Sequence, residues 1–125
     1  MSKALLTLAV LPLFSFLCDA KKRTSLCLQG KVIRTSCASF VVQILNNDTL
    51  GEDGWKDTNS PDATVYDNVF SVANLCKLPA DVKTGSTIYF NIDKPQPSGC
   101  VVCMMYDAPP ATQFDCKNVT LEPCK

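Results

Sequence analysis

Cysteine is the most informative residue type in this sequence, because it occupies eight of the 125 positions. Its meaning depends on the compartment, since disulfides persist in secreted proteins and are rare in the cytosol. Residues 1–20 have the features of a secretory signal: Lys3 near the start, an apolar run over residues 4–17, and small residues before a cut at Ala20. We therefore expect a secreted, extracellular protein whose mature part, residues 21–125, is a single domain.

The apolar run is shorter than the roughly 18 to 20 residues that a membrane helix requires, so no membrane span is expected. Secretion also gives two sequons a meaning, Asn47-Asp48-Thr49 and Asn118-Val119-Thr120. We expect Asn47 and Asn118 to be glycosylation sites.

Removal of residues 1–20 takes Cys18 away and leaves seven cysteines, an odd number, so one thiol stays free or joins another molecule. Cys103 and Cys116 flank a turn centred on Pro109-Pro110 symmetrically, as facing positions of a hairpin would. The spacing of Cys100 and Cys103 also occurs in redox motifs and zinc sites. The residues around them read as a strand, however, and no second clustered pair accompanies them, so structural disulfides are the preferred interpretation.

Five stretches are rich in β-branched and aromatic residues and are separated by turn residues, which is typical of strands: 31–34, 38–45, 64–72, 86–92 and 100–106. Helical periodicity is weak, and eight prolines interrupt the chain. The sequence predicts an all-β barrel or sandwich with little helix. The residues expected inside it are Val41, Val69, Ile88, Phe90 and Ile92, the last three of which share one face by alternation.

Charge and composition argue against several functions. Twelve basic residues balance twelve acidic ones, which disfavours nucleic acid as a partner, and the absence of histidine removes His-dependent catalysis and imidazole ligation. Asp53, Asp57 and Asp62 lie in an acidic loop, residues 46–63, with no base or electrophile nearby in sequence and without EF-hand spacing. We expect no enzyme, no catalytic residue, no metal and no cofactor.

Two features are candidates for a partner surface. Trp55 stands alone among the charges of the acidic loop, and tryptophan is enriched at binding hot spots, although the ring could equally close the loop over the barrel. Lys21, Lys22 and Arg23 form a basic start of the mature chain. Such a tail is either a solvated end or a contact for an anionic partner.

Two segments together resemble a known family. Residues 35–42, Thr-Ser-Cys-Ala-Ser-Phe-Val-Val, resemble the first barrel strand of netrin-like domains. Residues 74–90 resemble the central signature of that family, in which a cysteine is followed by a leucine-bearing loop, a glycine and a strand with tyrosine. Cys103 and Cys124 complete the pattern. The compact form is most similar to the small netrin-like excretory-secretory proteins of parasitic nematodes such as hookworms.

The resemblance implies a disulfide-stabilised, five-stranded OB-type barrel. It also implies two pairings, which with the hairpin pair give three bridges: Cys27–Cys76, Cys37–Cys124 and Cys103–Cys116. Cys100 is then the free thiol, which would link two chains if it reaches solvent and stay inert if buried. A disulfide-linked or non-covalent dimer is therefore open. Should Cys100 lie in an intrachain bridge, Cys116 is the next candidate for the free thiol.

The expected function is that of a secreted, non-enzymatic netrin-like binding module for an extracellular protein, including a host protein. One alternative is a carrier of a small apolar ligand. Another is a metalloproteinase inhibitor, since inhibitors of this family chelate the catalytic zinc with the amine of an N-terminal cysteine. Here Lys21 leads and Cys27 has six residues ahead of it, so inhibition would require cleavage after Leu17.

The signal reading is tested by the intact mass of the secreted protein. We expect a mass that begins at Lys21, because small residues at positions 18 and 20 direct the cut. A mass that still includes residues 1–20 would contradict this expectation.

Overall fold

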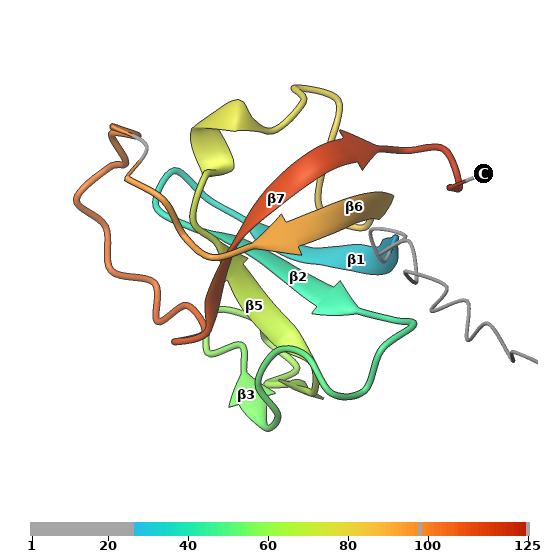
Figure 1. Cartoon of the computed structure of the whole chain (residues 1–125). Coiled ribbons are helices and arrows are strands. Elements are labelled where there is room, and N and C mark those ends of the chain that lie inside the picture. The colour runs from blue at the N-terminus through green and yellow to red at the C-terminus, as the bar shows by residue number, and fades with distance from the viewer. Residues whose placement is uncertain (1–26, 98, 125) are drawn as a thin grey trace, which may run out of the picture.

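The computed structural model describes residues 27–97 and 99–124 (Figure 1). The expected signal segment and the basic residues Lys21, Lys22 and Arg23 lie outside the described residues. The elements follow in the order β1 (Leu28–Thr35), β2 (Phe40–Ile44), β3 (Trp55–Lys56), β4 (Val65–Tyr66), β5 (Val69–Val72), the 3₁₀ helix η1 (Leu75–Lys77), β6 (Thr87–Asp93) and β7 (Gln113–Thr120).

Five of the strands form a barrel in the order β1-β2-β5-β7-β6, and the pairing of β6 with β1 closes it. Every neighbouring pair is antiparallel except β5 and β7, which run parallel. Counted among barrel strands alone, the third and fifth are parallel neighbours and the fourth pairs with the first, which is the OB arrangement. The expectation of an all-β, five-stranded OB-type barrel with little helix is confirmed.

The barrel interior is filled by apolar side chains. Phe70 packs at its centre, with ring centroids 5.8 Å from Phe90 and 5.2 Å from Phe114. The neighbouring strands approach closely at Gly30, where a Cβ atom would lie 2.6 Å from a methyl carbon of Val42. Glycine is therefore required at this position of β1, because any larger side chain would displace the core around it.

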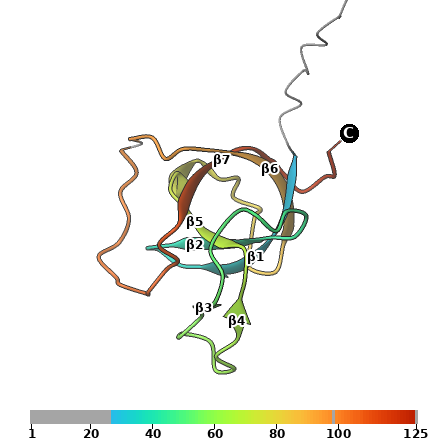
Figure 2. The ribbon, with the colours of Figure 1, turned by 60° about the horizontal axis from the view of Figure 1, so that its bottom comes forward.

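The expected interior set is right for β6 and wrong for two other residues. Ile88 and Phe90 are buried in the barrel core, and Ile92 packs against it. Val41 and Val69 are fully buried too, but they form a separate cluster with Trp55. Val41 neighbours the core residue Val42, and alternation along a strand sends the two to opposite faces. The strands β3 and β4 project from the barrel beside that outer face (Figure 2).

Strand positions follow the sequence for part of the chain. The first, second and fourth expected strands correspond to β1, β2 and β6, and the third divides into β4 and β5. Residues 100–106 form no strand, and the last barrel strand is instead the polar segment Gln113–Thr120. β7 was missed because its sequence is mostly polar: only Cys116 belongs to the buried core, and Phe114 and Val119 pack against it.

The expected disulfide pairing is wrong. The bridges are Cys27–Cys124, Cys37–Cys103 and Cys76–Cys100. The hairpin argument failed because residues 100–106 are not a strand, so Cys116 pairs in register with Ile92 of β6 instead. Cys100 lies in an intrachain bridge, and the free cysteine among the described residues is Cys116, which was the next candidate.

The Cys116 thiol should resist modification until the protein unfolds. Burial raises its pKa from 9.0 to about 12, and the charge of Asp115 adds to the shift. We expect iodoacetamide to leave the native protein unlabelled at pH 8 and to modify one thiol, Cys116, in denaturant. Rapid labelling of the native protein, or labelling at Cys100, would contradict the assignment.

The same raised pKa gives a second readout. Above pH 9.0 the thiol ionises in the unfolded chain but not in the native one, so stability should fall as the pH rises toward 12. Cys116→Ala is the matched control, because the part of the loss that the thiol causes disappears in that variant.

Candidate functional site

The most exposed large apolar side chains of the described residues gather in one loop between β6 and β7. Within residues 99–107, here called the stapled loop, Val101 is 91%, Met104 106% and Tyr106 89% exposed. Val102 and Met105 are exposed as well. Contiguous exposed apolar residues mark interaction sites in soluble proteins. The stapled loop is therefore the candidate functional site.

Two disulfides attach this loop to the barrel. Cys100 is bonded to Cys76 in η1, and Cys103 is bonded to Cys37 in the turn between β1 and β2. The backbone N–H of Cys103 also donates to the carbonyl of Cys37, at 3.2 Å. The loop lies at one side of the barrel in both views (Figures 1 and 2). These links fix its course even though it has no partner strand.

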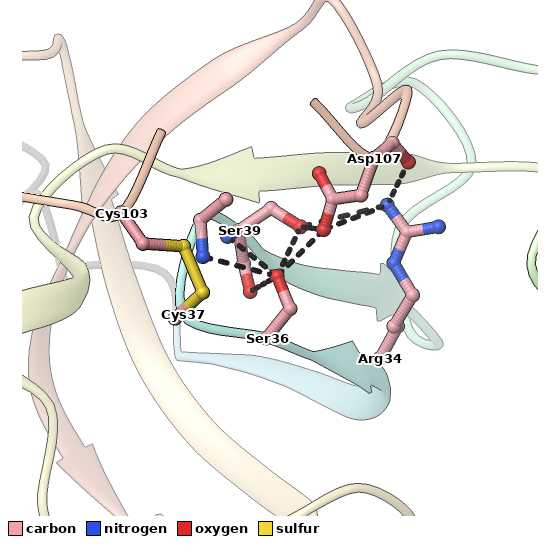
Figure 3. Close-up of a disulfide and its surroundings, with 7 residues drawn as sticks. Arg34, Ser36, Cys37, Ser39, Cys103 and Asp107 are labelled. Carbon is pink, nitrogen blue, oxygen red and sulfur yellow. Dashed lines mark hydrogen bonds and ion pairs between the residues drawn. A yellow bond between two sulfur atoms is a disulfide. The ribbon is translucent and has the colours of Figure 1, made fainter. Parts of the chain in front are cut away.

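Asp107 provides a third attachment, shown in Figure 3. Its buried carboxylate accepts hydrogen bonds from the hydroxyls of Ser36 and Ser39, each at 2.6 Å. The Ser36 hydroxyl oxygen also accepts hydrogen bonds from the backbone N–H groups of Ala38 and Ser39. The side chain of Ser36 thus shapes the turn and holds the loop on it.

Arg34 links the loop to the acidic segment behind it. One guanidinium nitrogen lies 2.8 Å from Asp57, while the other donates to the Asp107 carbonyl at 2.7 Å and lies 3.6 Å from its carboxylate. Burial alone would raise the pKa of Asp107. Hydrogen bonds from Ser36 and Ser39, and the charge of Arg34, outweigh it and lower that pKa. The carboxylate therefore stays ionised at neutral pH.

Trp55 belongs to the base of this site and not to its surface. The residue is 7% exposed, and its ring lies beneath the Arg34 guanidinium, whose carbon is 5.1 Å from the ring centroid. The indole N–H donates to the carbonyl of Ala108 at 3.1 Å. The hypothesis that Trp55 forms a partner surface is wrong, because the ring closes its loop over the barrel, which was the other reading.

The remaining sequence-derived residues lie apart from the loop. Asp53 accepts a hydrogen bond from the backbone of Asn68, and Asp62 is exposed, so the acidic loop forms no joint site with Asp57. In the described part of the chain, no three histidine, cysteine or acidic side chains gather in a way that could hold a metal ion.

Both sequons lie on the side away from the stapled loop. The connection after β2 carries Asn47, and the end of β7 carries Asn118 (Figures 1 and 2). The Asn47 side chain accepts hydrogen bonds from the backbone and the hydroxyl of Thr49, and Asn118 donates to Asn91. Their glycosylation stays a prediction.

Two grooves on the described residues bear on the alternative of a carrier of apolar ligands. A groove of about 230 Å³ runs under the loop, between Val72, Val102 and Pro109, and another of about 330 Å³ lies near Val82 and Leu121. Ligand pockets usually measure about 300–1,000 Å³, so the first groove lies below this range and the second at its lower end. Side chains fill the barrel interior. The described residues also contain no helix long and apolar enough to cross a membrane.

The position of the loop agrees with its candidate role. The turn between the first two barrel strands and the loop between the last two border the ligand-binding face of OB folds. The bridge between Cys37 and Cys103 joins these two loops here.

Comparison with known proteins finds no family model and no curated protein that matches the chain. Sequence reasoning missed the site because an uncharged apolar run reads as a buried strand.

Substitution of Asp107 tests the third attachment. Asp107→Asn should lower the free energy of unfolding by about 1–3 kcal/mol at pH 7, because it weakens buried hydrogen bonds to a charged acceptor. The folded pKa lies below the ordinary 3.8, so this stabilisation is complete above that value and is lost as the pH falls through the folded pKa. Urea denaturation at several pH values measures both effects.

Asp93→Asn is the control, because Asp93 pairs with Lys117 on the exposed surface. Exposed ion pairs contribute little to stability. Equal effects of the two substitutions at pH 7 would contradict the role assigned to Asp107.

Proposed function

We propose that this chain is a secreted, non-enzymatic binding module of the netrin-like kind, and that it binds an extracellular protein through the stapled loop. One observation carries the proposal: Val101, Met104 and Tyr106 are almost fully exposed on a segment held by two disulfides. A soluble protein gains nothing from exposing such side chains unless a partner covers them.

The loop has the physical properties of a binding hot spot. Aromatic side chains anchor many interfaces, and methionine adapts to irregular apolar surfaces. Ordering a flexible loop on binding costs free energy. The bridges at Cys100 and Cys103 order this loop when the protein folds, so less conformational freedom is lost on binding. The attached loop can therefore turn more of its contact energy into affinity.

The disulfides also support an extracellular setting. Three of them in a small domain fit a protein that works outside the cell. Each closes a loop of the chain, with sequence separations of 97, 66 and 24 residues. Cross-links of this kind typically stabilise the native state by about 2–4 kcal/mol each.

Affinity capture from extracellular fluid tests the proposal. Immobilised protein should retain a specific partner, and a variant with Val101, Met104 and Tyr106 all changed to serine should lose it, because apolar anchors dominate interface energies. The matched control changes Leu121 to serine, an exposed apolar residue outside the loop, and should still retain the partner. Capture that survives the triple change, or no capture at all, would contradict the proposal.

A further inference from the structure

One short segment of the stapled loop is anchored at both ends to a single turn. On one side Cys103 is bonded to Cys37, and on the other the Asp107 carboxylate accepts hydrogen bonds from Ser36 and Ser39. Three residues lie between these anchors: Met104, Met105 and Tyr106. The segment therefore forms a short arch on the turn of residues 36–39.

Met104 is the most exposed side chain of this arch. The chain bends at Met104, whose side chain is fully exposed, while Met105 is about half exposed and Tyr106 nearly fully exposed. Met104 and Tyr106 are therefore the two most exposed side chains of the arch. A segment that is anchored at both ends and carries its most exposed side chain, Met104, between the anchors suits a cleft that has a pocket.

The charge of the loop restricts that pocket. Residues 95–106 contain no lysine, arginine, aspartate or glutamate, and Asp107 is buried and paired. A pocket lined by charge would gain nothing from Met104 and would lose its own hydration. The complementary pocket is therefore apolar and uncharged.

An endopeptidase cleft of the chymotrypsin type combines these properties. It binds an exposed segment of another protein and selects one large apolar side chain in a hydrophobic slot. The two anchors also explain why the loop would inhibit such an enzyme and would not be released as a cleaved substrate. Hydrolysis after Met104 would add one water across the peptide bond and give a carboxylate and an amine, but Cys103 and Asp107 would keep both ends on the same turn.

We propose, on the basis of the function proposed above, that the partner is a secreted serine endopeptidase with an apolar primary pocket, and that the stapled loop occupies its cleft as a substrate-like inhibitor with Met104 in that pocket. Tyr106 contacts the part of the cleft that binds residues C-terminal to the peptide bond after Met104. Preorganisation of the arch by its two anchors gives the inhibitor its advantage over an ordinary substrate.

Inhibition of chymotrypsin and trypsin by the full mature protein tests this proposal. The unchanged protein should inhibit chymotrypsin and leave trypsin active, because the trypsin pocket carries an aspartate. Met104→Lys should weaken chymotrypsin inhibition by about 30-fold or more, the effect of losing a hot-spot side chain, and should create inhibition of trypsin. Leu121→Lys makes the same change on an exposed residue outside the loop and should alter neither activity.

Disulfide mapping and circular dichroism of each variant show that the barrel is intact, and gel analysis shows whether the loop is cut and released. The proposal is overturned if the unchanged protein fails to inhibit chymotrypsin or if chymotrypsin digests it as a substrate. It is also overturned if the Met104→Lys variant inhibits chymotrypsin and trypsin to the same extent as the unchanged protein. Capture of a loop-dependent partner together with any of these results would leave the binding function standing and remove only the protease assignment.

Discussion

The attachment of residues 100–107 to the turn of residues 36–39 organises one whole side of this molecule. It combines a covalent link, Cys37–Cys103, with a buried carboxylate, Asp107, that accepts from two hydroxyls of the same turn. The loop pairs with no strand among the described residues, so these contacts hold it on the turn. The exposed apolar side chains lie on the segment that they fix.

Arg34 extends this attachment into the rest of the fold. Its guanidinium lies between Asp57 and Asp107 and over the ring of Trp55, so the acidic segment, the loop and the outer face of the sheet meet at one cation. A buried ion pair contributes little by itself but is costly to break, because the remaining charge loses its partner. The network therefore fixes the relative positions of these three segments more than it adds to overall stability.

The sequence predicted the barrel but not the site. β2 follows a mostly apolar run and β6 a clear alternation, and local composition reveals both. β7 does not, because a closed barrel needs only Cys116 and a few neighbours of that strand to face inward. The pairing of Cys37 with Cys103 spans 66 residues and depends on the path of the intervening chain. The spacing of cysteines in the sequence does not reveal that path, so it could not predict the pairing.

The exposure of the loop was hidden for a related reason. Side chains that fill a core and side chains that enter the pocket of a partner belong to the same apolar types, so Val101, Met104 and Tyr106 read as a strand. Trp55 presented the opposite case, since a lone tryptophan among charges read as surface and is buried under Arg34. Their roles can be told apart only from the structure, in which Trp55 is buried under Arg34 and the apolar side chains of the stapled loop are exposed.

Backbone ¹⁵N relaxation of the free protein tests most directly whether the exposed apolar segment is held in place. Order parameters for the amides of Met104, Met105 and Tyr106 should be close to those of β6, about 0.85, because both ends of the segment are anchored. Order parameters below about 0.6 would mean a flexible loop, and would contradict the account in which the disulfide and the Asp107 network prepare it for binding.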